Sequence, residues 1–181
     1  GAGNTMVTEG VTAGVSYKHY DDDVRPSTGA FGEVKAGAFD EVGSAAIQDG
    51  SRIGYWLLET EGGVVIPMPW GPHRVVKLRG DFRTSRDFQN DEVPFYLMSE
   101  VGSESTVRGF VDRRYVGDDR LVLSGEYLYP AWTTAPLSLD AILFFDAGQV
   151  ANRIFSDISL GGFHGSAGLV LRMYTKKLVI V

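Results

Sequence analysis

Alternation of apolar and polar residues with a period of two runs along most of the chain and constrains the fold more than any other feature. In residues 75–83, small or apolar side chains alternate with charged ones: Val76, Leu78, Gly80 and Phe82 on one side, Lys77, Arg79, Asp81 and Arg83 on the other. Successive side chains of a strand point to opposite faces of a sheet. Helical periodicity is hard to find, so this period predicts long strands.

Similar patterns predict an all-β chain that forms one antiparallel meander over residues 1–181. The expected strands cover residues 11–20, 30–39, 52–60, 74–85, 93–101, 120–130, 137–147, 165–174 and 177–181. Turn-rich segments such as Asp21–Asp23, Glu61–Gly63 and Gly117–Asp119 separate them. Most of these strands approach the roughly 9–11 residues of a tilted membrane strand and exceed the roughly 5–6 residues typical of soluble sheets.

The two faces of the strands favour a membrane barrel over a soluble one. In an outer-membrane barrel, apolar side chains face lipid, aromatic residues form girdles at the interfaces, and the interior is polar. Aromatic residues gather at the predicted strand ends: Trp56, Trp70, Tyr127, Tyr129 and Trp132. The charged side of residues 75–83 suits a wet interior. A soluble β-sandwich or lipocalin-like barrel is the alternative, because it produces the same alternation.

Composition excludes several classes of function. The chain has no cysteine, which removes disulfides, thiolate metal sites and cysteine nucleophiles. His19, His73 and His164 lie far apart in the sequence without metal-like spacing. A formal net charge of −6 argues against nucleic acid as a partner. We therefore expect no catalytic, metal or cofactor residues.

Two short motifs occur in order in the second half of the chain. The first is Val107-Arg108-Gly109-Phe110, in a long connection between strands. The second is Phe144-Phe145-Asp146-Ala147-Gly148, on a strand of alternating character. Together they resemble the outer-membrane protein assembly superfamily, the BamA/TamA-like bacterial surface antigens. In that family, Val-Arg-Gly-Phe lies at the tip of the sixth surface loop and Phe-x-Asp-x-Gly lies on the thirteenth strand.

The resemblance implies a fold and a location. The family's barrel has sixteen strands, and the nine predicted here would be the seventh to the fifteenth. The chain would then be the C-terminal portion of a transmembrane β-barrel in the bacterial outer membrane, with the final strand missing. An open sheet cannot lie alone in lipid, since its edge N–H and C=O groups would be unsatisfied. Closure on eight strands, or pairing of two chains, are the other ways to complete it.

The resemblance also implies a non-enzymatic function, the insertion or translocation of proteins. The expected partners are outer-membrane lipid and lipopolysaccharide, unfolded outer-membrane or secreted client proteins, and accessory lipoproteins or a further barrel-forming chain. A competing hypothesis is a small outer-membrane barrel that acts as an enzyme or adhesin. That hypothesis needs a cluster of reactive side chains, and His19 beside Asp21–Asp23 is the one candidate.

The paired motifs suggest an internal clamp. A loop that folds back into the barrel removes the Arg108 guanidinium from bulk water, which is costly unless a carboxylate meets it. Asp146 is the expected partner, and Glu126, on the polar face of the preceding strand, is the second. Gly109 would let the loop tip bend and Phe110 would pack on the interior wall. In the alternative interpretation, Arg108 is an ordinary exposed loop arginine and Asp146 caps a turn before Gly148.

Overall fold

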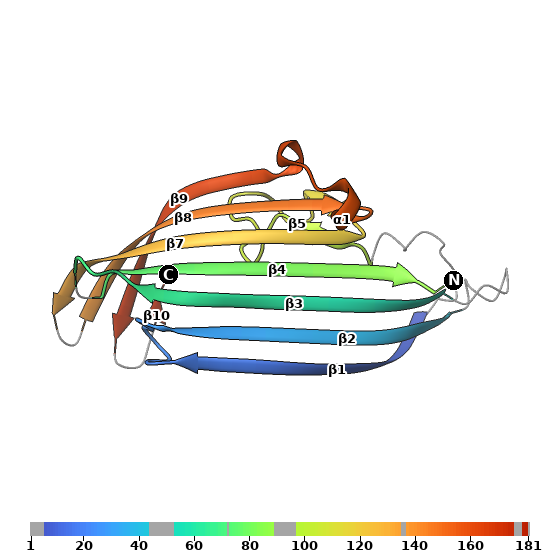
Figure 1. The fold of residues 1–181 in the computed structure, drawn as a ribbon, viewed down its shortest axis with the longest axis horizontal. Helices are drawn as coiled ribbons and strands as arrows, with labels where there is room; N and C mark the ends of the chain where they lie inside the picture. Colours follow the sequence, from blue (N-terminus) through green and yellow to red (C-terminus); the bar gives the residue numbers. More distant parts are fainter. Residues whose placement is uncertain are drawn as a thin grey trace, which may run out of the picture.

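The computed structural model describes residues 6–43, 53–71, 73–88, 97–134, 137–175 and 179–180. Most of them form one curved antiparallel sheet of eight strands in the order β1-β2-β3-β4-β7-β8-β9-β10 (Figure 1). The strands are β1 (Met6–Tyr20), β2 (Gly29–Gly43), β3 (Ile53–Pro67), β4 (Val75–Asp87), β7 (Asp119–Thr134), β8 (Leu137–Ala151), β9 (His164–Thr175) and β10 (Val179–Ile180). Each strand pairs with its neighbours in this order, so the sheet is a meander. The predicted fold class is confirmed.

The alternation decides which face each side chain occupies. On β8, Asp140, Ile142 and Asp146 are almost completely buried, whereas Leu143 and Phe145 are each 59% exposed. We call the face with Asp140 and Asp146 the inner face and the opposite one the outer face. Exposed apolar side chains of the outer face include Val64, Ile66, Leu78, Leu123, Tyr129, Leu143, Phe145, Leu169 and Leu171. This is the polarity of a barrel in lipid, with apolar residues outside and charges inside.

One predicted wall strand is wrong. Of residues 93–101, the structure describes 97–101, and Ser99–Val101 form β5, which pairs with β6 (Tyr115–Gly117) in a separate two-stranded sheet. β4 pairs directly with β7 instead. The alternation in this segment has another cause: Val101 is fully buried because one side of the loop packs against the inner face. By the family analogy, the eight wall strands would be the eighth to the fifteenth.

A second correction concerns Glu61–Gly63, which the sequence indicates as a turn but which lies inside β3. A side chain at Gly63 would place its Cβ 2.5 Å from the ring of Phe31 on β2. Glycine is therefore needed here because it leaves space for a neighbouring aromatic ring. It does not mark a reversal of the chain. The wall strands β1–β4, β7 and β8 are accordingly 13–16 residues long, longer than the sequence predicted.

Two short helices that the sequence analysis did not predict lie in the β8–β9 connection: α1 (Ile154–Asp157) and the 3-10 helix η2 (Leu160–Gly162). Their signal is the helical spacing of Ala151, Ile154, Phe155 and Ile158. Within the described ranges, no helix has the length and apolar character needed to cross a membrane.

Buried side chains form two clusters. The first contains Val65, Val75, Leu128 and Ile142, with Tyr20 and Val170 packed against it. It lies toward the end of the sheet that carries the β1–β2 turn, which we call the turn end. The second contains Val101, Val107 and Val122, with Phe110, Tyr115 and Val150 beside it. It fixes the β4–β7 connection to the inner face at the opposite end, the loop end.

Candidate functional site: an internal loop held by arginine

The β4–β7 connection lies against the inner face of β7 and β8 (Figure 1). Residues 97–118 of this connection are called the internal loop below. Val107 of the loop is fully buried against Val101 and Val122. The wall also holds the loop backbone, because the Arg79 guanidinium on β4 donates a hydrogen bond to the Ser105 carbonyl at 2.8 Å.

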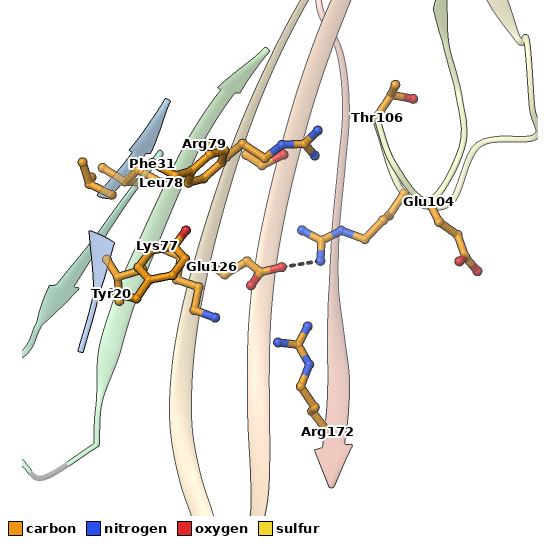
Figure 2. Close-up of a pocket in the computed structure, with 13 residues that line it drawn as sticks. Tyr20, Phe31, Lys77, Leu78, Arg79, Glu104, Thr106, Glu126 and Arg172 are labelled. Atoms are coloured by element: carbon orange, nitrogen blue, oxygen red, sulfur yellow. Dashed lines mark hydrogen bonds and ion pairs between the residues drawn. The ribbon is translucent and has the colours of Figure 1, made fainter. Parts of the chain in front are cut away.

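Arg108 links the loop tip to two wall carboxylates. Its Nε lies 2.7 Å from Asp146 Oδ2 and its Nη2 lies 2.8 Å from Asp146 Oδ1, a bidentate geometry. Its Nη1 lies 2.6 Å from Glu126 Oε1, the dashed contact in Figure 2. The Asp146 side chain is 1% exposed and that of Arg108 is 22% exposed. The structure thus brings together all three residues that the sequence analysis placed in the clamp.

Strand register explains why one guanidinium reaches both carboxylates. Asp146 pairs with Ser124 across β7 and β8, and Glu126 is two residues further along β7 on the same face. Both carboxylates therefore point to the interior. They lie close enough together for one planar guanidinium group, with its five N–H donors, to contact both. The hydrogen bonds to Asp146 and then Glu126 raise the pKa of Arg108 above its usual value, so the guanidinium stays charged.

The other motif residues shape the contact between loop and wall. Phe144 lies under the guanidinium, whose carbon is 4.0 Å from the ring centroid. Gly148 leaves space for the loop, since a Cβ there would be 2.7 Å from Val107 Cγ2. Gly109 has a φ of +86°, which favours glycine. Phe110 packs edge-to-face on Tyr115 in the loop, at 5.8 Å between ring centroids.

Further ion pairs cross the inner face in a band toward the loop end. Arg120 on β7 makes a bidentate contact with Asp81 on β4, at 2.7 and 3.0 Å. Arg79 and Arg83 on β4 pair with Glu61 and Glu59 on β3 at 2.7 and 3.2 Å. Each pair joins two neighbouring strands, so ion pairs connect the strands of the inner wall side by side. The charged face that the sequence analysis assigned to the interior accounts for this band.

A second internal arginine contact was missed by the sequence analysis. Arg25, in the β1–β2 turn, donates from Nε to Asp140 Oδ2 on β8 at 3.0 Å, and its Nη2 donates to Oδ1. Asp140 is 1% exposed, and the two residues are 115 positions apart in the sequence. The available signal was Asp140, which shares the face of Asp146. No pattern pointed to its partner, because the partner belongs to a turn.

We expect Arg25→Ala to destabilise the protein by about 1–3 kcal/mol, the range for lost hydrogen bonds to a charged group. Asp140 would lose both hydrogen bonds from Arg25 while its carboxylate stays largely buried. The measurement is the free energy of unfolding in urea of the full-length protein in detergent. Lys18→Ala is the control, since Lys18 and Asp23 form an exposed pair at 3.1 Å in the same region. Equal effects of the two variants would contradict this assignment.

The acidic residues beside His19 stabilise the β1–β2 turn. Asp21 accepts hydrogen bonds from the backbone N–H of Ser27 and Thr28 at 2.8 and 3.0 Å, and from the Ser27 hydroxyl. Asp22 accepts from the N–H of Val24 and Arg25. These carboxylates are used as turn acceptors, whereas the competing enzyme hypothesis needed them for chemistry. Among the described residues, no group of three His, Cys, Asp or Glu is placed to hold a metal ion.

The turn should survive strongly acidic conditions. Hydrogen bonds from the Ser27 hydroxyl and the Thr28 N–H lower the pKa of Asp21 to about 2. Because the folded value is below the ordinary one of about 3.9, the contribution of Asp21 is present above that pH and is lost as pH falls through about 2. NMR titration of the Thr28 amide should show a midpoint near 2. A midpoint at the ordinary aspartate value would disprove it.

Comparison with known proteins identifies the family. A family model described as the Omp85 superfamily domain matches residues 3–175. The chain belongs to the Omp85 superfamily. This membership confirms the resemblance drawn from the two motifs and places the chain in the bacterial outer membrane, in a family that inserts or translocates proteins. A search of curated proteins gave no match.

Among solved structures, the chain is similar to the crystal structure of BamA from Haemophilus ducreyi lacking POTRA domains 1-3. The TM-score is 0.70 at 19% sequence identity, and the match covers 90% of this chain. The likeness is one of fold. The chain spans 36% of that BamA chain, so the sheet corresponds to one part of the larger protein.

Proposed function

We propose that the barrel containing this chain inserts or translocates proteins at the outer membrane, without catalysing a chemical reaction. The observation that carries the proposal is the internal loop, which Arg108 fixes to Asp146 and Glu126 on the wall. A loop held inside a barrel supplies an interior support that is independent of complete strand closure. Residues 1–181 would form one barrel domain, and further strands of the protein would complete the barrel.

The proposed mechanism uses backbone hydrogen bonding. A weakly paired seam between the first and last strands of the complete barrel would open sideways and expose N–H and C=O groups. An incoming client strand would pair with that edge, as in β-augmentation. During opening the remaining wall must keep its shape. The inner ion pairs and the Arg108 clamp would supply that rigidity, because each joins the wall to the loop or strand to strand.

Several partners follow from this proposal. The exposed apolar outer face would contact lipid and lipopolysaccharide. Unfolded outer-membrane or secreted proteins would be the clients. Accessory lipoproteins, or a further barrel-forming chain, would complete the assembly. The roles of Val107, Gly109, Phe110, Phe144 and Gly148 would be to seat the loop so that Arg108 meets its carboxylates.

Reconstitution of the full-length protein into liposomes tests the function. An unfolded outer-membrane client is added, and its folding is measured by protease resistance and by altered migration of unboiled samples. We expect faster client folding than in empty liposomes, and a loss of this acceleration in Arg108→Ala. Arg113→Ala is the matched control, since Arg113 pairs with Glu100 at 3.1 Å in the same loop but is 46% exposed. No acceleration by the wild-type protein would refute the proposal.

A further inference from the structure

A cavity lies on the inner face between the Arg108 clamp and the β1–β2 turn (Figure 2). Its volume is about 310 Å³, and its lining includes Tyr20, Lys77, Glu126 and Arg172. This is near the lower end of the roughly 300–1,000 Å³ range of small-molecule sites. Figure 2 shows the Lys77 and Arg172 side chains extending toward each other below Glu126. They come from β4 and β9, on opposite sides of β7 and β8.

Lys77 and Arg172 have no carboxylate in ion-pair contact among the described residues, although each has one as its cross-strand neighbour. Lys77 is paired in register with Glu126, but Oε1 of Glu126 accepts from Arg108. Arg172 is paired in register with Asp140, but Arg25 contacts both oxygens of Asp140. The loop and the turn thus engage the carboxylates that would otherwise neutralise the two wall cations.

The remaining positive charge is concentrated. Arg172 is near enough to Lys77 for the two charges to repel each other, while the carboxylates of Glu126 and Asp140 attract Lys77 without forming an ion pair with it. The Arg172 Nε is buried and has no hydrogen-bond partner within the described part of the chain. By contrast, Arg79 and Arg108, which also line the cavity, contact Glu61 and the Asp146–Glu126 pair respectively. Two cations without an ion-pair contact among the described residues, with a buried N–H donor beside them, are the complement of a doubly charged oxyanion.

We propose that Lys77 and Arg172 form a binding site for a phosphate-type dianion in the interior of the barrel. A guanidinium presents parallel N–H donors that match phosphate oxygens, and an ammonium adds a compact point charge. The bound anion would bridge β4 and β9 and offset the repulsion between their cations. The site is independent of whether the barrel inserts client proteins, because it rests on charge and register alone.

Calorimetric titration of the full-length protein in detergent with inorganic phosphate tests this site. Near pH 7.5, where phosphate is largely the dianion, we expect saturable binding at one site that weakens as sodium chloride is raised. Lys77→Met and Arg172→Met should each weaken phosphate binding by about ten-fold or more, the effect of a lost charge-assisted hydrogen bond. Acetate, with one charge, should bind more weakly than phosphate.

Lys35→Met is the matched control, because it also removes a lysine charge from a wall strand. Lys35 pairs with Glu33 at 2.9 Å, so its removal should leave phosphate binding unchanged. Migration of unboiled samples checks that each variant is folded, and Arg172→Lys, which keeps the charge, should retain weakened binding. Absence of saturable binding to the wild-type protein would overturn the site. So would equal losses in Lys35→Met and Lys77→Met, or unchanged binding in both Lys77→Met and Arg172→Met.

Discussion

Replacement of Arg108 by alanine is expected to release the internal loop and to destabilise the protein by about 3 kcal/mol, the lower end of the 3–5 kcal/mol cost of breaking a buried ion pair. Asp146 is 1% exposed and would lose two hydrogen bonds from the guanidinium. The full cost is not reached because Arg108 is 22% exposed and its backbone N–H, 3.1 Å from Asp146 Oδ2, still donates. Urea unfolding of the full-length protein in detergent measures the loss.

Three variants separate the clamp from a general loss of charge. Arg108→Lys keeps the charge but loses the bidentate guanidinium geometry. It should therefore retain only part of the stability that Arg108→Ala loses. Arg113→Ala removes an exposed pair from the same loop and should cost at most about 1 kcal/mol. Exchange of the charges, Arg108→Asp with Asp146→Arg, should restore some stability without bidentate geometry. Limited proteolysis should cut the loop faster in Arg108→Ala alone, and equal cleavage of wild type and Arg108→Ala would contradict docking through Arg108.

The face of most wall residues was predictable because it depends on sequence parity, which is interrupted on β7 by the bulge between Pro130 and Trp132. A period of two places Asp140 and Asp146 on one side of β8 and Leu143 on the other, whatever the strand pairs with. The positions of Arg108, Asp146 and Glu126 followed from the same parity together with the two motifs. Glu126 and Asp146 lie on paired strands, and the register of these strands places the two carboxylates near each other. Arg108 can therefore contact both.

What the sequence did not indicate depends on tertiary contacts. Residues 99–101 alternate like a wall strand, but they pair with β6 in the internal loop. Parity cannot distinguish a strand that faces lipid from one whose buried side packs on the inner wall. Arg25 is a comparable case. Its reach to Asp140 depends on a turn shaped by Asp21 and Asp22 and on sheet curvature, which brings the β1–β2 turn within one side-chain length of β8.

Arginine in place of Leu143 should destabilise the barrel by about 2–4 kcal/mol, the cost of a cation on the lipid face near mid-membrane. Leu143 lies close to the middle of β8, is 59% exposed on the outer face, and is paired in register with Leu169 of β9, which is 64% exposed. A guanidinium at this depth would be surrounded by lipid and cut off from water. The free energy of unfolding of the full-length protein in lipid vesicles measures the effect.

Leu137→Arg is the matched control for Leu143→Arg, because it makes the same change on the same face of the same strand. Leu137 is the first residue of β8, at the turn end of the sheet, where an arginine can extend to the headgroups. Its cost should fall to about 0–1 kcal/mol. A depth-dependent difference between the two variants requires the outer face to be in lipid. Equally small costs, at most about 1 kcal/mol at both positions, would instead mean that both positions face water, and the assignment of inner and outer faces would have to be reversed.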